Sequence, residues 1–206
     1  FQKFCGLFAM CGLLAFRVGN FDNTAEREQF RFLCEQLKAH YENSNEFCVL
    51  AGNYNIGCEL DALFIKRDAI IAIEFKNYGG KVIANENGEW TCDGKVIKGG
   101  SRKTLLQQAR INHSILKKEL KTLGVEKNHI KDVPHLIVFH QPIELENNLS
   151  STTKSWLHIT DNVHFLDSQL AHAVGDFALV VALAVDAVAA FLRLHLAVVT
   201  AAAMRP

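Results

Sequence analysis

The sequence predicts an α/β sandwich in which helices cover a mixed β-sheet. Two observations support this prediction. The segment 21–172 runs through a helix, three strands, a hairpin, a second helix and a further strand, as judged from its apolar spacing. The composition, with 49% hydrophobic residues, 13 glycines and 3 prolines among 206 residues, is typical of a chain with a sizeable core and few long loops.

The first helix is expected to begin at Asn23-Thr24, because Asn is a preferred N-cap and acidic residues follow it. Glu26 precedes Phe30 by four residues, which places it on the apolar stripe, whereas Glu28 lies on another face. A carboxylate on the buried face of a helix needs a partner, so Glu26 rather than Glu28 is the candidate functional residue. The apolar stripe of this helix consists of Phe30, Leu33 and Leu37.

Two hairpins are expected after this helix. The runs 58–65 and 69–76 are separated by a short polar turn, which predicts an antiparallel pair, with the run 46–51 as a further strand before them. A second hairpin is expected over 90–97, because Asp93-Gly94 is a strong two-residue turn signal.

A helix over about 103–123 and a buried strand over 133–139 complete the expected core. A short strand and a helix are expected within 163–172. No internal repeat is present.

The two ends of the chain are apolar. For 4–16 we expect a packed or partner-bound helix, with a shortened membrane anchor as the alternative, because Arg17 interrupts the run and no signal-peptide cleavage motif follows. In 177–203, Asp186 and Arg193 would each cost roughly 2.5–3.5 kcal/mol at a bilayer centre, so a buried helix that contacts an oligomer or partner is favoured over membrane association. The predicted divisions of the chain are an apolar segment 1–20, a main domain 21–172 and an Ala/Val-rich helix 173–206.

The six cysteines are scattered without a CxxC or zinc-site spacing. Thiols of this kind are typical of a reducing compartment, so a cytoplasmic location is expected. The formal net charge of zero excludes wholesale polycation binding to nucleic acid or membranes, but leaves room for a local basic face.

The candidate chemistry lies in the first hairpin. Asp61 interrupts an apolar strand, and Glu74 and Lys76 end the next strand on one face. Glu59 and Asp61 are likewise expected to share a face, and a hairpin closed near 66–68 brings Asp61 close to Glu74. Two facing carboxylates repel each other unless a cation lies between them.

Oxygen ligands favour a hard ion such as Mg²⁺, for which Mn²⁺ would substitute. Lys76 beside such a site would hold a scissile phosphate or the attacking water. Both strands have the apolar character of two-sided burial, which argues against an exposed strand face. Spacing alone leaves a metal site and a structural Glu-Lys pair as equal alternatives.

A longer pattern includes these residues. In order it comprises Glu26, Gly57-x-Glu59-Leu60-Asp61, Ile73-Glu74-Phe75-Lys76-Asn77-x-x-Gly80, Lys81-Val82, Trp90, Leu105-Leu106-Gln107-Gln108-Ala109-Arg110-x-Asn112 and the strand around Val138-Phe139. The pattern resembles the nuclease-related domain (NERD), a family of the PD-(D/E)xK nuclease superfamily.

The resemblance implies a restriction-endonuclease-like sandwich with a helix-strand-strand-strand-helix-strand core and a metal-dependent phosphodiesterase centre. In that centre Asp61 and Glu74 are the implied metal ligands, assisted by the carbonyl of Phe75, and Lys76 is the catalytic lysine. The further implied site residues are the helix carboxylate Glu26, which completes or orients the metal's water shell, and the helix glutamine Gln108, with Glu59 as an additional candidate ligand.

Two positions depart from the family pattern. Lys103-Thr104 opens the second helix where the family often has Asn-Pro, and Thr24-Ala25 precedes Glu26 where the family has glycine. Neither change removes the central Asp…Glu-x-Lys set.

The segment 95–131 carries ten basic residues against Glu119 and Glu126. This local surplus fits a phosphate partner. The candidate residues for contacting a nucleic-acid backbone are Lys81, Arg102, Lys103 and Arg110.

The leading hypothesis is a Mg²⁺-dependent nuclease that hydrolyses DNA phosphodiester bonds, with water as the nucleophile. One alternative is a catalytically silent nucleic-acid-binding module of the same fold. Another is an interaction or membrane-proximal subunit in which the apolar ends dominate.

Overall fold

The computed structural model describes residues 12–162 except 22, 43–45, 56, 67–68, 101–102, 123 and 125–132. The expected elements within 163–172 and 177–203, and the predicted contacts of 173–206 with an oligomer or partner, therefore lie outside the described residues. The described elements are β1 (Gly12–Arg17), α1 (Thr24–Tyr41), β2 (Phe47–Asn55), β3 (Glu59–Lys66), β4 (Ala69–Lys76), β5 (Gly80–Asn85), β6 (Trp90–Cys92), β7 (Lys95–Ile97), α2 (Leu105–Thr122), β8 (His135–Phe139), β9 (Ile143–Asn148), α4 (Ser151–Lys154) and β10 (Leu157–Asp161).

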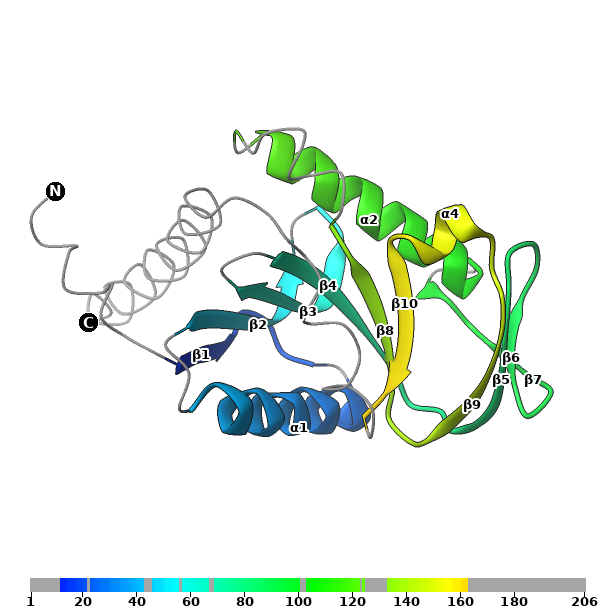
Figure 1. Cartoon of the computed structure of the whole chain (residues 1–206), viewed down its shortest axis with the longest axis horizontal. Helices are drawn as coiled ribbons and strands as arrows, with labels where there is room; N and C mark the ends of the chain where they lie inside the picture. Colours follow the sequence, from blue (N-terminus) through cyan, green and yellow to red (C-terminus); the bar gives the residue numbers. More distant parts are fainter. Residues whose placement is uncertain are drawn as a thin grey trace, which may run out of the picture.

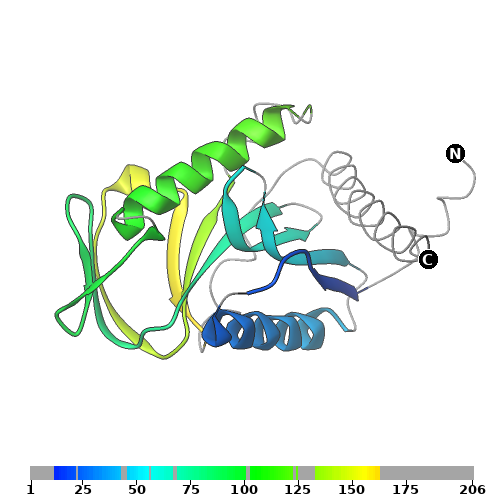
Figure 2. The same ribbon diagram turned by 180° about the vertical axis from the view of Figure 1, so that it is seen from behind.

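The strands form two sheets. The larger has the order β1-β2-β3-β4-β8-β10, and the smaller has the order β7-β6-β5-β9. In the larger sheet β2, β3 and β4 are antiparallel neighbours, whereas β1 pairs with β2, and β8 with both β4 and β10, in parallel. Helices α1 and α2 lie on opposite faces of this sheet (Figure 1, Figure 2). The predicted α/β sandwich with a mixed central sheet is confirmed.

Both predicted hairpins are present. Strands β3 and β4 pair from Ala62 opposite Ile73 to Lys66 opposite Ala69. Strands β6 and β7 are joined by Asp93 and Gly94, with φ of 48° and 75°. Positive φ at both central residues is the requirement of a type I′ turn, which an Asp-Gly pair meets.

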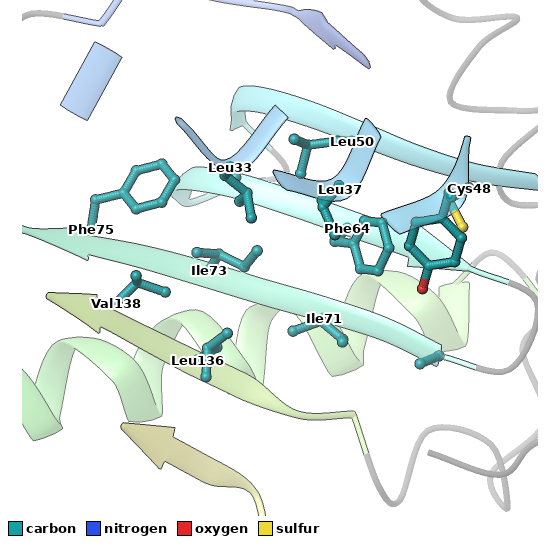
Figure 3. Packing of buried hydrophobic residues seen from close by; sticks show 13 residues of the cluster. Leu33, Leu37, Cys48, Leu50, Phe64, Ile71, Ile73, Phe75, Leu136 and Val138 are labelled. Carbon is teal, nitrogen blue, oxygen red and sulfur yellow. The ribbon is translucent and has the colours of Figure 1, made fainter. Parts of the chain in front are cut away.

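Helix α1 covers one face of the large sheet. The Asn23 side chain caps it by accepting the backbone N–H of Glu26 at 2.9 Å. Its buried residues pack onto β2, β3, β4 and β8, and Figure 3 shows these side chains meeting between the helix and the sheet. We call this group the α1 cluster: Leu33, Leu37, Tyr41, Cys48, Leu50, Ala62, Phe64, Ala69, Ile71, Ile73, Phe75, Leu136 and Val138.

Helix α2 covers the other face. Its C-terminal half packs onto the large sheet in a group that we call the α2 cluster: Val49, Leu60, Leu63, Ile65, Ile70, Ala72, Leu116, Leu120 and Val133, with Tyr54 and Phe16 partly buried against it. Its N-terminal half packs with the small sheet through Leu105, Leu106 and Ala109. Ile137 and Phe139 of β8 belong to the same cluster, so the small sheet and the start of α2 pack together against this strand.

The start of α2 explains the Lys103-Thr104 departure. The backbone N–H of Gln107 donates to the Thr104 hydroxyl at 3.2 Å, and the backbone N–H of Thr104 donates to the Gln107 side chain at 3.1 Å. This reciprocal pair is a capping box, which satisfies two backbone donors at the helix start. A different cap therefore begins the helix at this position.

The helix expected over 4–16 is wrong for its described part. Residues 12–17 form β1, which pairs in parallel with β2 from Gly12 opposite Phe47 to Arg17 opposite Gly52. Leu13 packs against the α1 cluster and Phe16 against the α2 cluster, as residues an odd number apart on a strand do. A short apolar run does not distinguish helix from strand by its periodicity, and here pairing with β2 decides the outcome.

Strands β9 and β10 were not expected from the sequence. Strand β9 pairs in parallel with β5, and β10 pairs in parallel with β8. Both are short and carry polar residues, so they lack an apolar run. Among the helices that the structure describes, none combines the length and the apolar character that a membrane span requires.

A group of three aromatic rings joins β8 to α2. Trp156 is stacked on His113 with ring centroids 4.3 Å apart, and meets His135 edge-on at 6.4 Å. His135 is fully buried, and neither of its ring nitrogens has a hydrogen-bond partner among the described residues. Burial, with help from the charges of neighbouring groups, lowers the pKa of His113 to about 4 and that of His135 to about 3.

These two histidines should make the protein sensitive to acid. Below pH 6.5 they become protonated in the unfolded chain but stay neutral in the folded chain. Folding stability is therefore lost as the pH falls toward the folded-state values, by about 1.4 kcal/mol per pH unit for each histidine. We expect His135→Leu to flatten this loss between pH 6.5 and 4 in urea denaturation, whereas the exposed His40→Leu does not. If the free energy of unfolding of His135→Leu fell with pH as steeply as that of the parent protein, buried neutral His135 would not be a cause of the acid sensitivity.

Candidate active site

The Glu74 carboxylate is the centre of the site. It lies near the end of β4, is 3% exposed and faces α2. Its Oε1 accepts hydrogen bonds from Lys76 Nζ at 2.7 Å and from Gln108 Nε2 at 2.9 Å. Strand alternation places Glu74 and Lys76 on the same face, and α2 brings Gln108 over them. Three of the predicted site residues are therefore in direct contact.

Asp61 lies beside this group on β3. Its Oδ2 accepts the backbone N–H of Phe75 at 2.6 Å. Burial and the nearby Glu74 raise the pKa of Asp61 well above its usual range, and Glu26 adds to this effect. The Phe75 N–H and Lys76 act in the opposite direction. The predicted proximity of Asp61 and Glu74 thus agrees with the observed pairing of β3 with β4.

Lys76 is held as a cation. Burial alone would lower its pKa, but the pKa is raised overall because Glu74 is charged and hydrogen-bonded to it, and because Asp61 and Glu26 are also negative. At neutral pH Lys76 is therefore protonated in the metal-free chain. A protonated lysine donates hydrogen bonds and stabilises negative charge, but does not accept a proton from water.

Helix α1 brings Glu26 toward the same end of the sheet. Glu26 is half-buried in the first turn, whereas Glu28 is exposed. The negative charge of Glu26 acts on both Asp61 and Lys76. The face predicted for Glu26 is therefore the one that the structure shows.

Gln29, one turn further along α1, was not among the residues predicted from the sequence. It is fully buried, and its Nε2 donates to the carbonyl oxygen of Val138 on β8 at 3.1 Å. This bond ties the N-terminal part of α1 to the sheet. Gln29 lies four residues before Leu33, on the apolar stripe. A polar residue on a buried face needs a hydrogen-bond partner, and this position in the sequence could have identified Gln29 as a structural contact.

Gln108 also joins the site to the loop before α2. Its Oε1 accepts the backbone N–H of Gly100 at 2.6 Å. At the neighbouring Gly99, a Cβ atom would lie 2.6 Å from the carbonyl oxygen of Thr104, so the loop requires glycine there. The amide of Gln108 thus fixes this loop relative to Glu74.

The residues predicted to contact nucleic acid differ in whether an acidic side chain lies next to them. Lys103 is exposed at the start of α2, and Arg102 lies outside the described residues. The Arg110 side chain is 47% exposed, and its guanidinium binds Glu86 at 2.5 Å. The Lys81 side chain is 54% exposed, and its ammonium lies 3.6 Å from Glu146.

The structure does not bring Glu59 together with the other candidates. Its side chain is exposed, and its backbone carbonyl accepts a bond from Asn112. Leu60 packs in the α2 cluster, so its neighbour Glu59 projects on the opposite face from Glu74. The expected shared face of Glu59 and Asp61 is not seen, because regular alternation is interrupted at Asp61.

The donor set of the site suits a hard divalent cation. Asp61 and Glu74 supply carboxylate oxygens, and the carbonyl of Phe75 lies between Glu74 and Lys76 in the chain. Within the part of the chain that the structure describes, no three His, Cys, Asp or Glu side chains are grouped to hold a metal. Two carboxylates and a carbonyl match an ion that keeps several waters, as Mg²⁺ does.

The fold and this set of side chains together define a class. A sandwich in which adjacent strands carry an Asp and a Glu-x-Lys, with a glutamine on the following helix, is the arrangement of the PD-(D/E)xK superfamily. The family model described as nuclease-related domain matches residues 23–140. The chain therefore belongs to the nuclease-related domain family. Comparisons with curated proteins and with solved structures gave no match.

The cost of burying the Asp61 carboxylate beside Glu74 should be measurable in the free energy of unfolding. A carboxyl whose pKa is raised by folding costs stability once the pH exceeds its unfolded value of 3.8. The cost grows by about 1.4 kcal/mol for each pH unit until the folded-state pKa is reached. We therefore expect Asp61→Asn to melt at a higher temperature than the parent protein at pH 7.5 in EDTA. The gain should shrink as the pH falls toward 4, because the parent carboxyl is then protonated.

The control for this measurement is Glu89→Gln, which neutralises an exposed carboxylate away from β3 and β4. It should leave the melting temperature nearly unchanged. A lower melting temperature for Asp61→Asn at pH 7.5 would show that the carboxylate is stabilising, and would refute the cost assigned to its burial and to its repulsion by Glu74.

Proposed function

We propose that this protein is a metal-dependent nuclease that hydrolyses phosphodiester bonds of DNA. The observation that carries the proposal is the Glu74 carboxylate, buried to 3% exposure between the Lys76 ammonium and the Gln108 amide, with Asp61 beside it. Membership of the nuclease-related domain family supports the same chemistry.

The metal would be held by Asp61, Glu74 and the carbonyl of Phe75. When bound, Mg²⁺ would polarise the phosphate and lower the pKa of a coordinated water. Mn²⁺, with the same preference for oxygen ligands, would substitute for it. The raised pKa of Asp61 supports this assignment, because two carboxylates that repel each other gain from a cation between them.

Lys76 would stabilise charge on the phosphate. Its raised pKa keeps it protonated, so it acts as a hydrogen-bond donor to a phosphate oxygen or to the attacking water. Glu26 would accept a hydrogen bond from water on the α1 side of the site. Gln108 is a positioning residue, since it fixes the orientation of the Glu74 carboxylate.

The proposed substrate is DNA, approached over the start of α2. Lys103 is exposed at this end of the helix, and the Gly100 loop is tied to the site through Gln108. Lys81 and Arg110 also lie at the surface, but each has a carboxylate partner that offsets its charge. Among these three candidates we therefore rank Lys103 first for contacting the DNA backbone.

The nuclease proposal is tested by cleavage of plasmid and linear DNA with and without Mg²⁺. We expect the protein to cut only with the metal, and both Glu74→Ala and Lys76→Ala to lower the rate by roughly 10²- to 10⁴-fold. The reason is that the first variant removes an implied metal ligand and the second removes the cation that stabilises the phosphate.

Lys38→Ala serves as the matched control, because Lys38 is an exposed lysine in the last turn of α1. It should cut at the parental rate. Undiminished cleavage by pure, folded Glu74→Ala or Lys76→Ala would refute the assignment. DNA binding without cleavage under any divalent metal would favour a silent binding module of the same fold.

The DNA-contact assignment is tested by the salt dependence of binding in EDTA. Each lysine that neutralises a phosphate contributes about one to the slope of log affinity against log salt concentration. We expect Lys103→Ala to lower this slope by about one, and Arg110→Ala to lower it by less, because Glu86 already offsets its charge. An equal or greater effect of Arg110→Ala would contradict this ranking.

A further inference from the structure

The alternation of side chains between the two faces of the sheet is interrupted on both β2 and β3 beside the site. On β3, Ala62 packs in the α1 cluster, whereas Leu60, two residues away, packs in the α2 cluster. Tyr54, which pairs with Leu60 from β2, also packs against the α2 cluster. Residues two apart on a regular strand face the same side, so the alternation is interrupted at the residues between them, Asn53 and Asp61.

The backbone of Asn53 accounts for the change. Asn53 lies inside β2 with φ of 46°, in the left-handed region. The β2–β3 pairing continues in the same register on both sides of it, with Gly52 opposite Ala62 and Tyr54 opposite Leu60, but Asn53 and Asp61 are not paired. A residue in the left-handed region interrupts the extended conformation on which alternation depends, so the residues on either side of it change faces.

Asp61 is the side chain whose direction changes. The β3–β4 pairing ends with Ala62 opposite Ile73, so the Phe75 N–H lies beyond the ladder. The Asp61 carboxylate accepts a hydrogen bond from this N–H at 2.6 Å. Backbone N–H groups of a strand lie in the plane of the sheet. The Asp61 carboxylate therefore lies beside the β4 backbone next to Glu74, in the plane of the sheet, rather than over the α2 face.

The segment after β1 holds Asn53 in this conformation. The backbone N–H of Gly19 donates to the Asn53 carbonyl at 3.2 Å, and the Asn53 side chain donates to the carbonyl of Asn20. Asparagine also tolerates the left-handed region better than other residues with a side chain. Contacts from the N-terminal part of the chain thus act on the site through a single residue.

We propose that Asn53 is a positioning residue for Asp61. Its left-handed backbone, held by residues 19–20, directs the Asp61 carboxylate to the Phe75 N–H and so sets its place relative to Glu74. The direction of Asp61 follows from the contacts alone, whereas the consequence for metal binding rests on the proposed function.

The test compares Asn53→Gly with Asn53→Ala and Asn53→Val. All three lose the side-chain bond to Asn20, but glycine adopts the left-handed region freely, alanine less readily and valine least. The first readout is the amide proton shift of Phe75 in the metal-free protein by NMR, with Asp61→Ala marking the shift without the carboxylate. The second is Mn²⁺ affinity by calorimetry.

We expect Asn53→Gly to keep the parental Phe75 shift and Mn²⁺ affinity. Asn53→Ala and Asn53→Val should move the shift progressively toward that of Asp61→Ala and weaken Mn²⁺ binding by roughly 10- to 100-fold, the range of other groups that orient metal ligands. Folded alanine and valine variants that match Asn53→Gly would overturn the proposal. Unfolding of both would also overturn it, because the role would then lie in folding.

The two proposals fail in different ways. If the parent protein neither cleaves DNA nor binds Mn²⁺, the proposed function is wrong. The Phe75 shift still supports the positioning role if it changes across the glycine, alanine and valine series, and refutes that role if it does not.

Discussion

Burial of the Glu74 carboxylate is the constraint on which the site depends. A buried charge without a partner costs several kcal/mol, so other side chains must offset it. Lys76 does so from the same face of the strand and Gln108 from α2. Gln108 reaches Glu74 only if α2 begins at the right place, which the Thr104–Gln107 capping box secures. The hydrogen bonding of Glu74 therefore depends on where α2 begins.

The sheet topology lets three elements meet at this centre. Strand β4 lies between antiparallel β3 and parallel β8. From β3 comes Asp61, which binds the β4 backbone rather than the α2 face. On the other side, the Val138 carbonyl of β8 accepts the bond from Gln29, which anchors the N-terminal part of α1 near Glu26. The acidic residues therefore approach the end of β4 from separate elements.

Local signals in the sequence predicted most of the core and the central residues. Turn residues and apolar spacing located both hairpins and both helices, and alternation placed Glu74 and Lys76 together. Alternation failed at Glu59, because left-handed Asn53 reverses the faces of two strands, and an asparagine inside a strand signals this only weakly. For β1, a tertiary contact with β2 decided between helix and strand. Such choices depend on neighbours that are distant in sequence.

The charges at the end of β4 set the proposed metal binding against the stability of the chain without metal. Asp61, Glu74 and Glu26 are near enough for their charges to interact, and Lys76 offsets them in part. Burial and that imbalance together raise the pKa of Asp61 in the metal-free chain. A divalent cation between the carboxylates would turn the same repulsion into binding energy. A site that was fully neutralised by the protein itself would be more stable, but it would have less to gain from a metal.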